Sequence, residues 1–286
     1  MKAPVKLNNS FFPKWLKFIM PMSEDPTSLE VFFEGTEEFI ADHSTAISTL
    51  KFGDTFKTTS AGRHSEANNF VKQYLKDTSK RADILDLGAS NGVTSLDLIE
   101  LLGDCLDRYY VTDLNLKVWM TRHENWLIFF DSFNKPILKA SKYFVVYNDP
   151  MDSSSFITSR IRKTFESINS RNLTKEEILL IDPRLEKLSR SNDKISFSEH
   201  NIFDFWDKST PNVVKVSNIL NRAYFSDDLI KSAIQQIKNY VEDGALIVFS
   251  RNDAAMEKVS TFIKKGKSLI AHESLNGGVE IVDLID

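Results

Sequence analysis

The clearest hydrophobic pattern in the chain lies between residues 83 and 103. Residues 83–87 form a short apolar run (DILDL), and residues 88–92 (GASNG) interrupt it with two glycines. Apolar side chains then recur at helical spacing up to Gly103, at Val93, Leu96, Ile99 and Leu102. The pattern predicts a buried strand, a tight glycine turn and a helix that ends at a glycine.

Further strands follow at a spacing that suits alternating strands and helices. Residues 108–115 (RYYVTDLN) predict a second strand ending in an acidic residue, which completes a strand–helix–strand unit and calls for a parallel sheet. The next predicted strands cover 194–199, 212–219 and 245–250. A helix between the last two begins after Ser226, with Asp227 and Asp228 in its first turn, where the helix dipole favours anions.

The end of the chain predicts a helix followed by a hairpin. A helix is expected over 254–264, and strands over 268–274 and 279–285 flank Asn276-Gly277-Gly278. The expected fold is therefore α/β, a doubly wound, mostly parallel seven-stranded sheet with an antiparallel last strand.

Two regions stand outside this alternation. Residues 1–78 form an expected N-terminal arm and helical cap, with an amphipathic helix around residues 67–75, ahead of a Rossmann-like domain over 79–286. Residues 116–193 form an insertion after the second strand, longer than a simple crossover needs. Within it we expect a hairpin in 126–147 and helices near 156–168 and 175–188. Because ligands of open α/β sheets bind beyond the carboxyl ends of the strands, the insertion is interpreted as a lid or substrate wall.

Composition narrows the function classes. The 286 residues include 42% hydrophobic side chains, enough for a sizeable core, and carry 36 Lys plus Arg against 40 Asp plus Glu, a formal net charge of −4. This balance does not support a broad nucleic-acid footprint. The single cysteine, Cys105, excludes an intrachain disulfide and a cysteine zinc site, so a reducing, cytoplasmic location is expected. Lysines and prolines break the apolar stretch 11–22, which predicts a packed arm, with no membrane span and no signal peptide.

The candidate chemistry centres on the glycine turn and the acid that ends the second strand. Gly88 and Gly92 let a ligand lie against backbone beside a helix N-terminus, and Asp113 follows about 20 residues later, where a carboxylate can accept hydrogen bonds from ribose hydroxyls. An adenosine-type ligand is therefore predicted. A dinucleotide turn requires G-x-G-x-x-G, whereas these places hold Gly88, Ser90 and Val93. A nicotinamide oxidoreductase is accordingly disfavoured.

The spacing Asp86-x-Gly88-x-x-x-Gly92 resembles the first motif of the class I, or Rossmann-like, S-adenosylmethionine-dependent methyltransferases. Ser90 is a departure, since that family often has glycine there. The resemblance covers about residues 81–286 and implies S-adenosylmethionine as cofactor. It implies that Asp113 binds the ribose and Leu114 flanks the adenine, while His200, Asn201 and Ile202 read the adenine edge. It further implies that Ser217 and Asn218 form the wall beside the methionine part.

The methyl acceptor and the base are less constrained. Candidate bases near the strand ends are His200, His123 and Tyr224. The stretch 214–225 resembles chemotaxis-receptor methyltransferases. On this resemblance, Arg63 in the segment 58–63 is expected to bind the carboxylate of the cofactor. A small-molecule acceptor (O- or N-methylation) is the first expectation. A protein carboxylate acceptor, or a non-catalytic cofactor-binding protein, is the alternative. The oligomeric state stays open, and no metal site is expected.

Each assignment has a structural alternative. Gly88 and Gly92 also suit a tight connection in a domain without a cofactor, and Asp113 suits a helix N-cap. His200 also suits a structural role. The aromatic residues of the insertion, Trp119, Trp126, Phe129, Phe130 and Tyr143, are expected to form its own core, with a substrate cage as the alternative.

Overall fold

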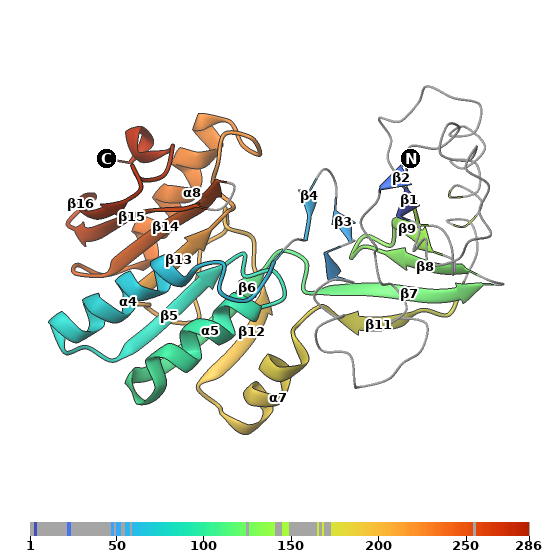
Figure 1. The fold of residues 1–286 in the computed structure, drawn as a ribbon, viewed down its shortest axis with the longest axis horizontal. Coiled ribbons are helices and arrows are strands. Elements are labelled where there is room, and N and C mark those ends of the chain that lie inside the picture. Colours follow the sequence, from blue (N-terminus) through green and yellow to red (C-terminus); the bar gives the residue numbers. More distant parts are fainter. Residues whose placement is uncertain are drawn as a thin grey trace. The chain divides into compact units, whose positions relative to one another are not determined.

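The structure is a computed structural model that describes residues 3–4, 22–23, 47–48, 50–52, 55–57, 59–123, 126–140, 145–148, 165, 168, 173–253 and 256–285. The chain divides into two compact units. One comprises Met1–Thr58 and Lys117–Asp182, and the other comprises Thr59–Leu116 and Pro183–Asp286. Figure 1 shows the elements of both units, coloured by residue number, and each unit is described separately below.

The second unit contains a seven-stranded sheet in the order β12-β6-β5-β13-β14-β15-β16. Its strands are β5 (Ala82–Leu87), β6 (Leu106–Asp113), β12 (Ile195–Glu199), β13 (Val213–Ser217), β14 (Leu246–Asp253), β15 (Met256–Lys265) and β16 (Ser268–Leu275). The first five are parallel to one another, and β15 runs antiparallel to both β14 and β16. The predicted seven-stranded, mostly parallel sheet with an antiparallel end is confirmed.

Helices cover both faces of this sheet, as a doubly wound fold requires (Figure 1). The helices α4 (Ser65–Thr78) and α5 (Val93–Leu102) contact one face, where α4 packs on β14 and β15 and α5 packs on β6. The short helix α7 (Pro183–Ser191) contacts the edge strand β12, and a 3-10 turn (Gly103–Cys105) joins α5 to β6. The predicted amphipathic helix around residues 67–75 is therefore present as α4.

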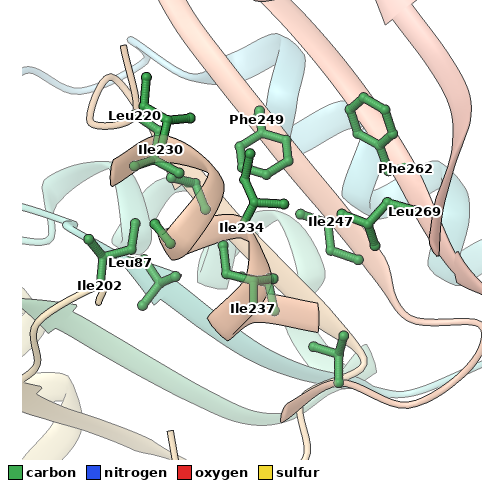
Figure 2. Packing of buried hydrophobic residues seen from close by; sticks show 14 of the residues in the cluster. Leu87, Ile202, Leu220, Ile230, Ile234, Ile237, Ile247, Phe249, Phe262 and Leu269 are labelled. Carbon is green, nitrogen blue, oxygen red and sulfur yellow. The ribbon is translucent and has the colours of Figure 1, made fainter. Parts of the chain in front are cut away.

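The opposite face carries α8 (Asp227–Tyr240), whose apolar stripe of Ile230, Ala233, Ile234 and Ile237 is fully buried. Figure 2 shows these isoleucines packed against Leu87, Ile247 and Phe249 from the strands beneath them. Successive side chains of a strand point to opposite faces. Leu85 and Leu87 therefore face α8, whereas Asp86 between them faces α4 and α5.

Two predicted elements at the end of the chain are wrong. Where the structure describes it, the segment predicted as a helix over 254–264 belongs to the strand β15, with Leu246 opposite Ile263 in an antiparallel pairing with β14. The residues of β15 include Met, Glu and Lys, which favour helices, but the sheet edge left by β14 offers a hydrogen-bond ladder and burial for Val259 and Phe262. Cross-strand pairing therefore overrides local propensity.

The predicted final strand over 279–285 is a turn ending in the 3-10 helix Val282–Leu284, and β16 instead pairs back on β15. Val279, Ile281 and Leu284 are buried in the α8-side core, which explains their apolar pattern. An alternating apolar pattern indicates which side chains are buried. A compact irregular segment can bury alternate side chains as well as a strand can.

The other unit contains a five-stranded sheet in the order β10-β9-β8-β7-β11. Its strands are β7 (Lys117–His123), β8 (Trp126–Phe130), β9 (Pro136–Ala140), β10 (Val145–Tyr147) and β11 (Glu176–Leu179), and all neighbours are antiparallel. Short paired segments also occur earlier in the chain, namely β1 (Ala3–Pro4), β2 (Met22–Ser23), β3 (Lys51–Phe52) and β4 (Thr55–Phe56).

The predicted hairpin in 126–147 corresponds to β8 and β9. Most of the predicted helix over 156–168 lies outside the described residues. The helix predicted over 175–188 is wrong in its first half, where β11 pairs with β7, while its second half lies in α7. Residues 117–182 of the predicted insertion cluster with residues 1–58, whereas α7 clusters with the seven-stranded sheet.

Candidate functional site

The turn between β5 and α5 is built from left-handed backbone. Gly88, Ser90 and Gly92 have φ angles of 68°, 59° and 78°. The backbone N–H of Ala89 donates to the Thr112 carbonyl of β6 at 2.8 Å, which ties the turn to the neighbouring strand. Glycine adopts this conformation without steric cost, whereas Ser90 carries a Cβ into it. The turn therefore passes close to the carboxyl ends of both β5 and β6.

Asp113, at the end of β6, is fixed against this turn. The Ser90 N–H donates to Asp113 Oδ2 at 2.8 Å, and the Asn115 N–H donates to Oδ1 at 2.9 Å. The His200 N–H, just past β12, donates to the Asp113 carbonyl at 3.0 Å. Three predicted site residues from separate segments, Ser90, Asp113 and His200, are thus joined by hydrogen bonds.

Two polar atoms of this group are buried without a hydrogen-bond partner among the described residues. They are the Ser90 hydroxyl Oγ and the His200 ring nitrogen Nε2. Burial lowers the pKa of His200, which stabilises its neutral form, and Trp206 packs edge-on against its ring. A buried polar atom without a partner costs about 1–3 kcal/mol, so two such atoms on residues hydrogen-bonded to Asp113 indicate a place for a polar ligand or ordered water.

The two glycines of the turn contact side chains of the protein itself. A methyl group on Gly88 would lie 1.7 Å from Cδ1 of Ile219, and one on Gly92 would lie 2.3 Å from Cδ2 of Leu185. A side chain at either position would therefore require these neighbouring side chains to move. The presence of the two glycines alone does not identify a ligand.

Asp86 lies beneath the turn, in the layer between the sheet and α5. Its Oδ2 accepts hydrogen bonds from Ser95 Oγ at 2.8 Å and Tyr109 OH at 2.7 Å, and it pairs with Lys215 Nζ at 3.2 Å. Asp86 and Lys215 are almost completely buried, and burial raises the pKa of Tyr109 well above its usual value. The structure thus places Asp86 in an internal ion pair that links β5 to β13.

A second polar cluster lies at the carboxyl ends of β13 and β14. Ser217 ends β13, Ser250 lies opposite it within β14, and their hydroxyls share a hydrogen bond of 2.9 Å. Asn218 follows at a left-handed φ of 60°, and its amide bonds to Asn252. Arg63 reaches this cluster through Nε, which donates to Asn252 Oδ1 at 3.3 Å. Three predicted cofactor residues, Arg63, Ser217 and Asn218, therefore lie together.

The remaining predicted residues are more dispersed. Leu114 is 61% exposed next to Asp113, and Tyr224 is 52% exposed in the loop after β13. The Asn201 side chain accepts from the Phe203 N–H and so closes its own turn, while the Ile202 side chain is part of the α8-side core. His123 ends β7 in the other unit, so the structure does not relate it to this site.

Sequence reasoning missed His64, Glu257 and Lys215. His64 precedes α4 and pairs with Glu257 of β15, and both are buried. Glu257 was not predicted to face the strand ends because its segment has the composition of a helix. One signal for Lys215 was present in the sequence, since this lysine interrupts an otherwise apolar strand. Because lysine is rarely buried unless it is paired, a lysine in such a strand predicts a buried partner of opposite charge. Among the described residues no cluster of metal-ligating side chains occurs.

Comparisons with known proteins give structural similarities only. No family model and no curated protein matches the chain. The N-methyltransferase NodS from Bradyrhizobium japonicum, in complex with S-adenosyl-L-homocysteine, aligns at 12% identity over 66% of this chain and 62% of its own, with a TM-score of 0.34. The chain thus spans less than two thirds of NodS.

Two further solved structures align at a similar level. An S-adenosylmethionine-dependent methyltransferase from Clostridium acetobutylicum aligns at 10% identity over 74% of this chain and 72% of its own, with a TM-score of 0.35. An amino pentose methyltransferase from Micromonospora echinaspora, solved with S-adenosylmethionine bound, aligns at 7% identity over 75% of each chain, with a TM-score of 0.33. Similarities with TM-scores below 0.5 establish neither a family nor an activity for this chain.

Proposed function

We propose that the seven-stranded unit binds S-adenosylmethionine at the carboxyl ends of its parallel strands and transfers the methyl group to a small molecule. The observation that carries the proposal is the pair of unpartnered buried atoms, Ser90 Oγ and His200 Nε2, on residues hydrogen-bonded to Asp113. These atoms need polar partners that the described residues do not supply.

An adenosine group supplies partners of the required kinds. Its ribose hydroxyls both donate and accept, so they suit the Asp113 carboxylate and the Ser90 hydroxyl. The neutral His200 ring has one donor and one acceptor nitrogen, and the purine edge offers both. The exposed Leu114 side chain next to Asp113 provides an apolar surface for the adenine ring. The residues present therefore fit the adenosine half of the cofactor.

The methionine half is assigned to the second polar cluster. Its ammonium and carboxylate suit the amide and carbonyl groups around Asn218 and the guanidinium of Arg63, and we keep Ser217 and Asn218 as the wall beside the departing methyl group. Asp86 pairs with Lys215 inside the protein, so we assign it a supporting role beneath the turn.

When bound, the sulfonium supplies an electrophilic methyl group. The chain's task is to hold an acceptor in line with it and to exclude water, and positioning of this kind contributes about 7–11 kcal/mol. A conspicuous catalytic triad is therefore unnecessary. Tyr224 stays the proposed base within this unit. His200, whose ring is assigned to the purine edge, and His123 are tested as bases by His200→Ala and His123→Ala, and a fall of less than about tenfold in turnover would remove either from that role.

The direct test is calorimetric titration of S-adenosylhomocysteine into the wild type and Asp113→Ala. Loss of the carboxylate should weaken binding by about 1–3 kcal/mol, a factor of roughly 5–150. Asp107→Ala is the matched control, because Asp107 lies at the other end of β6 in an exposed pair with Arg81. Equal affinities for all three proteins, or tight binding of NAD instead, would remove the proposal.

Measuring S-adenosylhomocysteine formation distinguishes a small-molecule methyltransferase from a protein methyltransferase and from a non-catalytic cofactor-binding protein. Incubation of S-adenosylmethionine with mixed small-molecule acceptors should produce S-adenosylhomocysteine if the acceptor is small. Product formed only with added protein acceptors would favour a protein side-chain methyltransferase. Binding without conversion under any condition would indicate a non-catalytic cofactor-binding protein.

A further inference from the structure

His64 is held between two side chains at the methionine end of the proposed site. Its Nδ1 lies 3.1 Å from Glu257 Oε1, and its Nε2 lies 3.3 Å from Asn218 Nδ2. His64 is only 5% exposed and Glu257 only 7%. The second oxygen of Glu257 accepts from the Glu66 N–H in the first turn of α4 at 2.9 Å. The pair therefore connects the start of α4, β15 and the end of β13.

The orientation of the Asn218 amide follows from its contact with Asn252. The Asn252 backbone N–H can only donate, and it lies 2.7 Å from Asn218 Oδ1. Nδ2 of Asn218 must then face Asn252 Oδ1 at 3.0 Å and His64 Nε2 at 3.3 Å. Because Nδ2 is a donor, His64 Nε2 must be the acceptor.

The same reasoning determines the tautomer of His64. With Nε2 accepting, a neutral ring carries its proton on Nδ1, where Glu257 Oε1 accepts it. Ser250 Oγ, 3.4 Å from Nδ1, is the only other polar neighbour that a described contact gives this nitrogen, and Ser250 donates its own proton to Ser217. Every contact in the group agrees with one proton arrangement.

The Asn218 amide in turn holds Asn252, which contacts Arg63 twice. Asn252 Oδ1 accepts from Arg63 Nε at 3.3 Å, and Asn252 Nδ2 donates to the Arg63 carbonyl at 3.1 Å. A rotation of Asn218 would therefore change the support of the guanidinium that is proposed to face the cofactor's carboxylate.

We propose that His64 and Glu257 form a positioning pair that fixes the Asn218 amide, and through Asn252 the Arg63 side chain, for binding the methionine half of the cofactor. This inference rests on the proposed function. His64 is a positioning residue, because its ring is buried and acts through Asn218.

Protonation of His64 would break this arrangement. A proton on Nε2 would face the amide protons of Asn218, and relief by rotating the amide would place its Nδ2 against the Asn252 N–H. The charged groups around the ring are Glu257 from β15, Lys215 from β13 and Asp86 from β5. Burial lowers the pKa of His64, while the Glu257 contact opposes that shift. The arrangement therefore requires the neutral form of the His64 ring.

The test is the pH dependence of S-adenosylhomocysteine binding, measured by calorimetry between about pH 5 and pH 8. Wild-type affinity should fall toward the acid end, and the fall should approach roughly tenfold as His64 becomes fully protonated, as expected for loss of one well-placed hydrogen bond. His64→Gln supplies an amide that can donate to Glu257 and accept from Asn218 but cannot be protonated. It should bind within about threefold of wild type near pH 8 and lack the acid fall.

Three further variants make the result specific. His64→Ala should weaken binding roughly tenfold across the whole range, because Asn218 loses its acceptor. His272→Gln, at an exposed histidine of β16, should keep the wild-type profile. Partial burial also lowers the pKa of His200, so its contribution is tested by His200→Gln. An acid fall that persists in His64→Gln and disappears in His200→Gln would overturn the proposal.

The proton arrangement is tested without ligand. In the ¹⁵N spectrum of histidine-labelled wild-type protein, assigned through His64→Gln, the His64 resonances should show a protonated Nδ1 and an unprotonated Nε2 near pH 8. A protonated Nε2 would contradict the pair. Absence of S-adenosylhomocysteine binding at every pH would instead refute the proposed function while leaving this spectroscopic result readable.

Discussion

Ser90 combines two unfavourable features at a single position. Its φ of 59° brings a Cβ into a left-handed conformation, and its hydroxyl is buried without a partner among the described residues. Left-handed backbone costs a non-glycine residue roughly 1–2 kcal/mol. A residue that is costly in the free protein is expected where it serves a ligand.

Replacement of Ser90 should therefore raise stability and lower affinity. Ser90→Gly removes both the left-handed Cβ and the unpartnered hydroxyl, so we expect the free energy of unfolding in urea to rise by about 1 kcal/mol. Ser90→Ala removes only the hydroxyl and should give a smaller gain. If Ser90→Gly destabilises the protein, the hydroxyl has a partner in the free state and the ligand argument weakens.

At the scale of elements, the alternation of β5 and β13 brings a carboxylate and an ammonium together inside the protein. Asp86 and Lys215 lie on the α4 and α5 side of the sheet, between neighbouring residues that face α8. Ser95 from α5 and Tyr109 from β6 complete the hydrogen bonds. The ion pair thus joins three strands and a helix directly below the proposed site.

Removal of one partner of this pair should be severe. Lys215→Met leaves a buried carboxylate without its cation, and we expect a loss of about 3–5 kcal/mol in the free energy of unfolding. The double variant Asp86→Asn with Lys215→Met should recover much of that loss. Lys258→Met, which breaks an exposed pair with Asp253, is the control and should cost less than about 1 kcal/mol.

The glycine turn depends in the same way on its neighbour across the sheet. Gly88→Ala places a methyl group 1.7 Å from Cδ1 of Ile219, so the end of that side chain must move, and it puts a Cβ on left-handed backbone. Thermal unfolding should therefore show a loss of about 1–3 kcal/mol in stability. Adding Ile219→Ala removes the clash and should leave a deficit from backbone strain and lost burial. A Gly88→Ala protein as stable as wild type would contradict the described packing.

At the scale of the whole molecule, the buried His64 and the half-buried His200 make stability depend on pH. Burial lowers the pKa values of His64 and His200 below the ordinary 6.5 that both regain on unfolding. Between the lowered values and 6.5 the unfolded chain binds more protons, so stability rises with pH across that window and is flat above it. Asp83, whose pKa burial raises, acts with the opposite sign in a more acidic range.

The urea midpoint should therefore fall as pH decreases from about 6.5 toward 5. In the double variant His64→Gln with His200→Gln this part of the dependence should be largely removed. If the urea midpoint of the double variant depends on pH as it does in the wild type, other titratable groups cause the dependence. The described helices include none long and apolar enough to span a membrane.

Local pattern was sufficient for the elements that carry their own signals. The strand, glycine turn and helix around residues 83–102, the acid ending β6 and the helix α8 were all predictable, because buried strands and amphipathic helices impose distinct periodicities. These elements led to the seven-stranded, mostly parallel sheet and to the grouping of Ser90 with Asp113.

Only the tertiary structure decided what depends on partners distant in sequence. Segment 256–265 is a strand because β14 offers it a ladder, and that pairing places Glu257 193 residues beyond His64 yet in contact with it. Likewise, Asp86 faces Lys215 only once β5 and β13 are neighbours. Periodicity records which side of an element is buried, whereas strand pairing and side-chain contacts are set by the whole fold.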